Sequence, residues 1–76
     1  MTIANDIISC RVPDLDFYLR EGDSLDDIDE YGFTPLIESI ITRQMHIAQL
    51  LLDKGVDINK PDVTGRTALH WAVVAN

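Results

Sequence analysis

The sequence predicts an all-α solenoid in which a helix-turn-helix unit and a long loop repeat along the chain. One observation is an internal period of 33 residues, a length typical of repeat proteins. The others are a helix-opening Thr34–Pro35 step and an apolar face at helical spacing in the segment that follows. Moving the chain by one period superimposes Asp29 on Asp62, Gly32 on Gly65, Thr34 on Thr67 and Leu36 on Leu69. The chain is therefore expected to consist of copies of one unit.

The first helix of the complete unit should start at Pro35. Thr34 is a natural N-cap, because its hydroxyl can accept a free backbone N–H of the first turn. Pro35 then takes the first helical position, where a missing N–H costs nothing. We expect this helix to run to about Thr42, with Arg43 and Gln44 as the turn.

A second helix should run from about Met45 to Lys54. Ile47, Leu50 and Leu51 recur at helical spacing and predict its apolar face. Gly55 should supply the left-handed residue that ends the helix. The segment VDINKPDVTGR that follows contains Pro and Gly as helix breakers, so it is expected to be a long loop with turns.

Size and cysteine usage predict one small domain without disulfide bonds or structural metal ions. The chain has 76 residues and a single cysteine, Cys10, which cannot pair within the chain. No His/Cys cluster has metal-ligand spacing, so no metal or cofactor is expected. No apolar stretch approaches the ~20 residues of a membrane span, and a cytoplasmic protein is the resulting expectation.

The net charge of −7 lies entirely within residues 1–30, densest from Asp23 to Glu30, whereas residues 31–76 are balanced. Nucleic acid is a poor partner, because binding it requires clustered Lys and Arg. A basic protein surface would be steered to the acidic end. The alternative is that these acids only keep the chain soluble.

Nothing in the sequence predicts catalysis. His46 and His70 fall in different units, and no nucleophile stands beside an orienting acid, so we expect no enzyme activity. Residues 27–38 carry acids and a glycine at several positions of a calcium-binding loop. Tyr31 stands where an oxygen ligand is needed and Pro35 opens a helix inside the loop, so calcium is rejected.

The strings DEYGFTPLIESI, DVTGRTALHWAV and AQLLLDKGVDIN, together with the 33-residue period, resemble ankyrin repeats over nearly the whole chain. The resemblance implies one domain of about two and a half repeats. Residues 1–28 would be a degenerate cap, 29–61 a complete repeat and 62–76 the first half of a third. In the cap, Ile3, Ile7 and Ile8 should face the stack, Pro13 should mark the inter-helix turn, and the apolar residues of the second helix are Leu15, Phe17 and Leu19.

The resemblance also assigns roles to residues. Structural positions of the repeat motif are Gly32, Thr34, Pro35, Leu36, Gly55, Gly65, Thr67, Leu69 and His70. For His70 it implies a hydrogen bond between neighbouring repeats. The chain departs from the family pattern in having Ile37 where His is usual and Arg43 where Gly is usual.

Ankyrin repeats recognise other proteins through a concave surface of loop tips and first helices, and this implies a partner-binding site. The corresponding positions are Glu30, Tyr31, Phe33, Ile41, Thr42, Val63, Thr64, Arg66, Val74 and Ala75. Tyr31 and Phe33 are the most suggestive, because aromatic anchors are enriched in binding hot spots, and both should be exposed. The alternative for Phe33 is packing onto the next loop tip. Trp71 is expected to be stacking surface rather than an anchor.

Two functions remain open at this level. The first is a protein-interaction module that forms the N-terminal part of a longer scaffold protein, of a regulatory protein or of an effector delivered into a host cytosol. The second is a structural or regulatory segment that packs against another domain of its own larger, enzymatic or non-enzymatic, protein. Because Leu69, Trp71 and Val73 have no second helix to cover them, association through the open end is a further expectation.

Overall fold

The computed structural model describes residues 3–75, and of Ala75 only the backbone. The binding role predicted for Ala75 concerns its side chain, which lies outside the described part of the chain. Met1 and Asn76, the predicted limits of the domain, lie outside it as well. The described chain contains five α-helices and no strand, as predicted: α1 (Ile3–Ile8), α2 (Leu15–Arg20), α3 (Pro35–Ile41), α4 (Met45–Asp53) and α5 (Ala68–Ala75).

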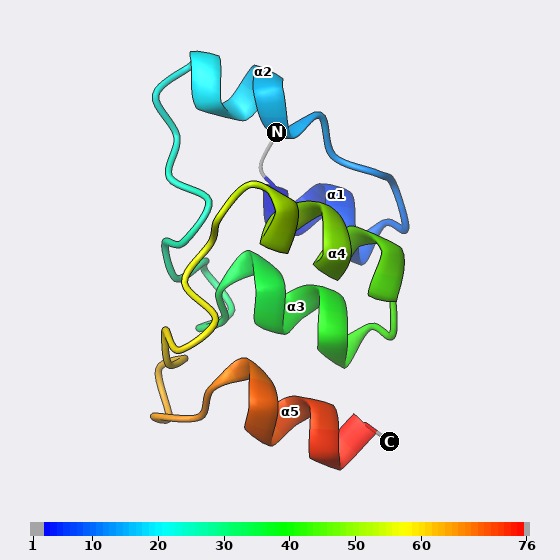
Figure 1. Cartoon of the computed structure of the whole chain (residues 1–76), viewed down its shortest axis with the longest axis vertical. Coiled ribbons are helices and arrows are strands. Elements are labelled where there is room, and N and C mark those ends of the chain that lie inside the picture. The colour runs from blue at the N-terminus through cyan, green and yellow to red at the C-terminus, as the bar shows by residue number, and fades with distance from the viewer. Residues whose placement is uncertain (1–2, 76) are drawn as a thin grey trace.

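The helices form a stack with α3 at its centre (Figure 1). α3 packs against α1 on one side and α5 on the other, and its partner α4 lies alongside it. The long loops that follow α2 and α4 run down the same edge of the stack, so the turns that precede α3 and α5 come close together. This is the arrangement of a solenoid, in which each unit contacts only its neighbours.

The predicted start of α3 is confirmed. The Thr34 hydroxyl accepts a hydrogen bond from the Ile37 backbone N–H at 3.2 Å, and Pro35 takes the first helical position. α3 ends at Ile41 and α4 at Asp53, each one residue before the predicted end. Gly55 follows with a φ of +82°, the left-handed conformation expected of it.

The turn between paired helices uses a left-handed residue that is not glycine. Arg43 has a φ of +61°, and Cys10, one period earlier, has a φ of +60°. Side chains with a Cβ adopt this conformation at a cost of about 1 kcal/mol. The departure from the family's glycine at Arg43 therefore leaves the turn geometry intact but strained.

The core runs through the stack from α1 to α5. Ile7, Ile37, Ile47 and Leu51 are fully buried within it. Ile37 occupies the position where the family usually has His, so an apolar contact replaces a polar one at the centre of α3.

Several predicted core residues are exposed instead. Ile8 is 43% exposed, and Leu50 is 39% exposed although Leu51 beside it is fully buried. In α2 the predicted Phe17 and Leu19 are 42% and 46% exposed, whereas Tyr18 between them is buried. The buried pair Leu15 and Tyr18 is spaced three residues apart, which is the spacing of one helix face.

Tyr18 is buried together with a polar partner. Its hydroxyl donates to Asp6 Oδ2 at 2.6 Å, which joins α2 to α1. Burial, followed by this hydrogen bond and the Asp6 charge, raises the pKa of Tyr18 to about 12. The cap is therefore held by a satisfied buried polar pair as well as by apolar packing.

Successive units are tied by hydrogen bonds at both ends of the helices. The Gln44 side-chain amide donates to the Ile7 carbonyl oxygen at 2.6 Å, a buried contact that the sequence reading missed. At the loop end, the Asp57 backbone N–H donates to Asp26 Oδ1 at 2.9 Å. These bonds fix the register between α1–α2 and α3–α4.

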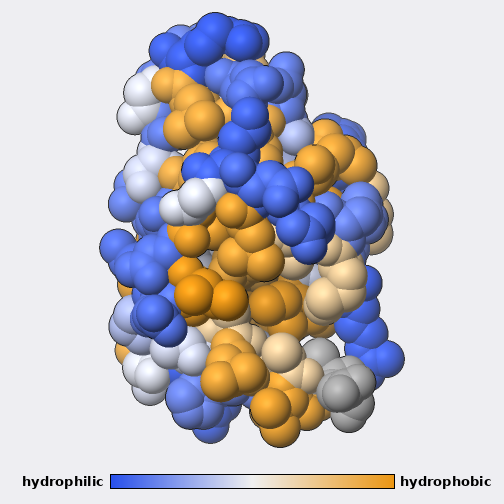
Figure 2. All heavy atoms as spheres, in the orientation of Figure 1, coloured by the Kyte–Doolittle hydropathy of each residue, from blue (hydrophilic) through white to orange (hydrophobic). Residues whose placement is uncertain are grey.

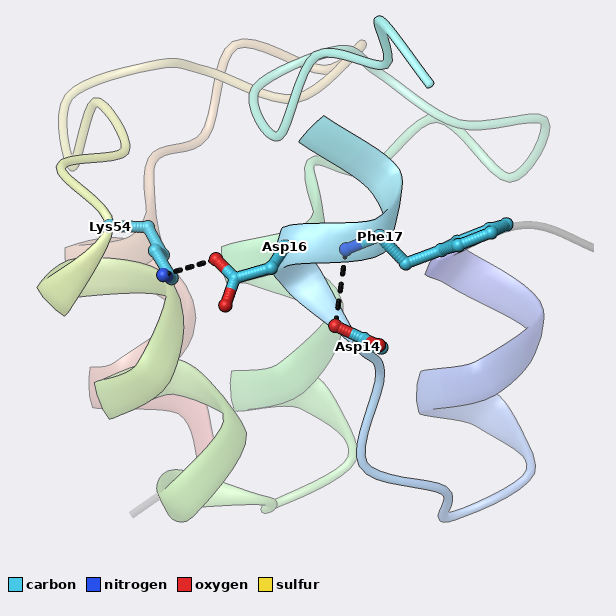
Figure 3. A network of polar contacts seen from close by, with 4 residues as sticks. All are labelled: Asp14, Asp16, Phe17 and Lys54. Atoms are coloured by element: carbon cyan, nitrogen blue, oxygen red, sulfur yellow. Dashed lines mark hydrogen bonds and ion pairs between the residues drawn. The ribbon is translucent and has the colours of Figure 1, made fainter. Parts of the chain in front are cut away.

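Polar contacts at the surface hold α2 in place (Figure 3). Asp14 caps α2, its Oδ1 accepting the Phe17 backbone N–H at 3.1 Å. Lys54, at the end of α4, places its Nζ 2.6 Å from Asp16 Oδ1. The Lys54 ammonium lowers the pKa of Asp16 through the hydrogen bond and its charge. Because both side chains are exposed, this ion pair orients α2 more than it stabilises the fold.

Hydrophobic residues gather over the lower half of the molecule, around α3 and α5, while hydrophilic ones cover the region of α2 and the loop edge (Figure 2). On α5, Leu69, Val73 and Val74 are about 70% exposed, as the sequence led us to expect for the first two. None of the helices in the described part of the chain is both long and apolar enough to cross a bilayer.

Candidate protein-binding surface

The loop tip that precedes α3, residues 29–33, is held by one carboxylate; we call it the Asp29 tip. Asp29 Oδ1 accepts the backbone N–H groups of Tyr31 at 2.8 Å and Phe33 at 3.0 Å. The Asp29 N–H donates back to the Phe33 carbonyl at 2.8 Å, and Gly32 turns the chain with a φ of +88°. The tip is therefore a closed, hydrogen-bonded turn.

The loop tip that precedes α5, residues 62–66, repeats this frame; we call it the Asp62 tip. Asp62 Oδ1 accepts the N–H groups of Thr64 at 2.8 Å and Arg66 at 3.0 Å, and also the Thr64 hydroxyl at 2.6 Å. Gly65 turns the chain with a φ of +84°. Aspartate and glycine at the same offsets thus build the same turn twice.

The two tips contact each other. The Val63 N–H donates to the Gly32 carbonyl at 2.9 Å. Val63 also packs so closely that a Cβ on Gly32 would lie 2.6 Å from its Cγ1, so any other residue there would have to displace the Val63 side chain. Tyr31 and Val63 remain 52% and 71% exposed. Their sequence neighbours Glu30 and Thr64 are exposed as well, so four exposed residues gather where the two tips meet.

Phe33 is not part of that exposed surface, contrary to the expectation for both aromatics. It is half-buried and meets Trp71 edge to face, with ring centroids 5.8 Å apart and planes at 90°. The alternative weighed from sequence, packing onto the next loop tip, names the correct neighbouring unit but not the correct element, because the ring meets Trp71 of α5. The physical reason is that Trp71 of α5 offers an aromatic face that shields Phe33 from water.

Trp71 joins this packing to the Asp62 tip. Its indole Nε1–H donates to Asp62 Oδ2 at 2.7 Å, and the Arg66 guanidinium carbon lies 5.3 Å from its ring centroid. Trp71 is half-buried and acts as stacking surface, as expected. Arg66, although exposed, is thereby held over the indole and is less free to meet a partner.

The Asp62 carboxylate is strongly stabilised by these donors. Burial alone would raise its pKa, but the hydrogen bonds from the Thr64 hydroxyl, the Trp71 indole and the Arg66 and Thr64 N–H groups lower the pKa to about 2. Asp62 is therefore charged at any ordinary pH and holds its tip permanently.

Two predicted binding residues, Ile41 and Thr42, lie away from the tips. They are half-buried at the other end of α3, about 10 Å from its start for a helix of this length. The Thr42 hydroxyl already donates to the Glu38 carbonyl at 2.9 Å and accepts from the Gln44 amide at 2.9 Å. Val74, near the end of α5, also lies away from the tips but is 69% exposed. The structure thus separates the predicted residues into a tip group and a helix-end group, in which Ile41 and Thr42 are committed to local contacts.

His70 bonds within its own unit. Its Nδ1 accepts the Thr67 backbone N–H at 3.3 Å and lies 3.1 Å from the Thr67 hydroxyl. The bond to a neighbouring repeat that the resemblance implied does not occur among the described residues. His70 is exposed there because nothing within residues 3–75 covers that side of α5.

An acidic hollow opens beside the Asp29 tip. It has a volume of about 400 Å³ and is lined by Asp23, Asp27, Asp29 and Glu30, with Ile3 and Pro35 among its apolar residues. The dense acidic segment noted in the sequence is therefore folded into a concave wall that continues the tip surface at Glu30. Within residues 3–75 no group of three or more His, Cys, Asp or Glu side chains is arranged to hold a metal ion.

Comparison with known families identifies the architecture. A model described as "Ankyrin repeats (3 copies)" matches residues 8–76. The chain belongs to the ankyrin repeat family. Ankyrin repeats are protein–protein interaction modules.

Relatives of this ankyrin chain are much longer proteins. A solved structure titled "Structure of Legionella Effector AnkH" is 74% identical with a TM-score of 0.92, covering 96% of this chain and 16% of that one. Inversin from Danio rerio is 43% identical over 54 residues, which is 71% of this chain and 5% of inversin. A putative ankyrin repeat protein of Borreliella burgdorferi is 34% identical over 47 residues, or 62% of this chain and 22% of that protein. The chain thus spans a small part of the relatives it matches.

Proposed function

We propose that this chain binds a partner protein through the surface made by Glu30, Tyr31, Val63 and Thr64, as part of a longer effector that acts in a host cytosol. The observation that carries the proposal is the rigid presentation of Tyr31. Its backbone N–H is fixed to Asp29, yet half of the side chain is free to contact a partner. A preorganised aromatic side chain loses little entropy on binding, which is what an anchor residue requires.

The charge of the neighbouring hollow supports a partner with a basic surface. Four acids line it, and the chain as a whole carries a net charge of −7. A Lys or Arg side chain that enters the hollow while Tyr31 packs against the partner would be attracted from a distance and then held. Such binding should weaken as salt is raised.

The effector role is supported by the similarity to the Legionella effector. The match extends over 96% of this chain at 74% identity, which is far higher than shared architecture alone requires. Because the chain corresponds to 16% of that protein, the activity of the whole effector is not assigned to these residues.

The proposal is tested by capture from a host cytosolic lysate, with the bound proteins identified by mass spectrometry. The variant is Tyr31→Ala, which leaves Phe33 in place because Phe33 is packed on Trp71. The matched control is Met45→Ala, which removes a side chain that is 54% exposed, like Tyr31, but lies at the start of α4. Circular dichroism verifies that the parent, Tyr31→Ala and Met45→Ala have equal helical content.

The expected result is a partner that the parent and Met45→Ala retain and Tyr31→Ala loses, with binding reduced at least tenfold and weakened by salt. Capture that is unchanged in Tyr31→Ala would overturn the proposed surface. It would favour the alternative in which this segment packs against another domain of a larger protein, and the great length of the relatives is the observation that keeps that alternative in view.

A further inference from the structure

A buried acid lies behind the Asp29 tip. Glu38, in the middle of α3, is only 5% exposed. Its Oε2 and the Oδ2 of Asp29 are both shielded from solvent, and as two carboxylates neither atom has a hydrogen-bond partner among the described residues. Unpaired charged oxygens at such a position are costly, so one of the two groups must be able to supply a hydrogen.

The second copy of the unit shows what belongs at this position. One period after Asp29 and Glu38 stand Asp62 and Trp71. There the Trp71 indole N–H donates to Asp62 Oδ2 at 2.7 Å, while Oδ1 accepts the tip N–H groups. The Asp29 tip has the same Oδ1 bonds, but its Oδ2 has no N–H donor, and Glu38 stands at the sequence position of the indole. Glu38 can act as that donor only when it is protonated.

We propose that Glu38 carries a proton and donates it in a hydrogen bond to Asp29, and that this proton is a pH-sensitive latch that holds the Asp29 tip, and with it Tyr31, in the closed turn. When the proton is lost, two carboxylates face each other in a buried site. Asp29 can then relieve the repulsion only by moving, and its Oδ1 would leave the N–H groups of Tyr31 and Phe33. The latch does not rest on the proposed function. It makes the rigid presentation of Tyr31 a property of the state in which Glu38 is protonated.

The electrostatic environment of Glu38 indicates that it loses its proton near neutral pH. Burial, then the negative charge of Asp29 and the hydrogen bond with it, raises the pKa of Glu38 to about 7 from its ordinary 4.5. The folded state therefore holds more protons than the unfolded state between these values. The latch stabilises the fold fully at pH values below about 4.5, and this stabilisation is lost as pH rises through about 7.

Other ionisable groups on the elements packed around α3 do not substitute for Asp29. Asp6 of α1 is engaged with the Tyr18 hydroxyl, and His70 of α5 with Thr67. Among the charged groups, Asp29 is the one that adds to the effect of burial in raising the pKa of Glu38. The titratable groups on the three helices are Asp6 on α1, His46 and Asp53 on α4, and His70 on α5.

The test is an NMR titration of the chain from pH 4.5 to 9, following the side-chain carboxyl carbon of Glu38 and the backbone amides of both tips. We expect the Glu38 carbon to titrate near pH 7. The Tyr31 and Phe33 amides should shift with the same midpoint, and those of Thr64 and Arg66, whose tip has an indole donor, should not respond. A Glu38 midpoint below pH 5, or Tyr31 and Phe33 amides that do not follow it, would overturn the proposal.

A variant makes the second arm of the test. Glu38→Gln keeps the size of the side chain and places an N–H donor at Asp29 that does not titrate. We expect the parent to lose thermal stability from pH 5 to 8, and Glu38→Gln to keep a constant melting temperature over this range. An equal loss in both proteins would contradict the latch, and if Glu38→Gln does not fold, the titration of the parent decides alone.

Discussion

The two loop tips have one backbone and different side-chain partners. In both, an aspartate accepts the N–H groups two and four residues later, at 2.8 and 3.0 Å, and a glycine closes the turn. At the Asp62 tip the remaining carboxylate oxygen accepts an indole N–H, whereas at the Asp29 tip it is buried without such a donor and its side-chain neighbour is the Glu38 carboxyl. The aspartate and glycine therefore determine the shape of the turn, and the residue nine positions after the aspartate determines how firmly it is held.

The largest effect that this comparison predicts is the loss of Asp62. Asp62→Ala removes the acceptor of four donors, from the Thr64 and Arg66 backbone, the Thr64 hydroxyl and the Trp71 indole. We expect a cost of about 3 kcal/mol in the free energy of unfolding, since four partly buried donors lose their acceptor.

At pH 7.5 Asp29→Ala should cost only about 1 kcal/mol, because it removes fewer bonds and relieves the repulsion with Glu38. Urea unfolding of the two variants under the same conditions provides the measurement. Equal costs would show that the indole and the carboxyl are interchangeable and would remove the difference between the tips.

The next effect concerns the glycines. Gly32→Ala and Gly65→Ala both force a Cβ into a left-handed residue, which costs about 1 kcal/mol. Only at Gly32 does the new Cβ strike a neighbour, Val63, because nothing lies within 4 Å of a Cβ on Gly65. We expect Gly32→Ala to cost about 2 kcal/mol more than Gly65→Ala in urea unfolding. The double variant Gly32→Ala/Val63→Ala should recover most of the difference in stability. If it does not, contact with the Val63 side chain is not the cause of the extra cost at Gly32.

The two tips should also lose stability in opposite directions of pH, the Asp29 tip as pH rises and the Asp62 tip as pH falls. The pKa of Asp62 is lowered to about 2, so the stabilisation it provides is present above its ordinary value of 3.8 and is lost as pH falls toward 2. We expect the melting temperature to fall from pH 4 to 2, with the emission of Trp71 shifting to the red. In Asp62→Asn this fall should be smaller. If the melting temperature of the parent and of Asp62→Asn falls equally from pH 4 to 2, other carboxylates control the loss of stability in acid.

The smallest effect on stability is expected at the opposite end of the helices. There the cap and the following unit each have a strained turn between their two helices. Arg43→Gly and Cys10→Gly both relieve a residue held near φ +60°. We expect each to stabilise the chain by under about 1 kcal/mol, because the relief is offset by the greater freedom of glycine in the unfolded chain. Thermal unfolding of the two single variants measures this, and destabilisation at Arg43 would mean that its side chain makes a contact worth more than the strain.

How far the sequence predicts the molecule depends on the range of the interaction. The start of α3 at Pro35 and the end of α4 before Gly55 follow from bonds within one turn, and both were predicted to within a residue. Tyr18 was missed because α2 is so short that three apolar residues in a row give no clear face. The period offered a signal that would have found it, because Tyr18 falls on the buried Leu51.

The binding surface was predicted less completely than the fold. Tyr31, Val63 and Thr64 are exposed at the tips, but Phe33 is covered by Trp71, which is 38 residues away in sequence. The acidic hollow likewise needs the start of α1 to approach the loop that follows α2. Charge density alone indicated acids at this end and could not indicate a concave site.

By itself, the sequence determined the repeat, its family and the turn at each tip, because a 33-residue period, helix caps, and aspartate and glycine at fixed offsets act through neighbouring bonds. The tertiary structure alone decided which aromatic is exposed and which donor meets each tip aspartate. Those outcomes depend on how closely α3 and α5 stack, since only that contact places Trp71 against Phe33 and leaves Glu38 buried behind Asp29.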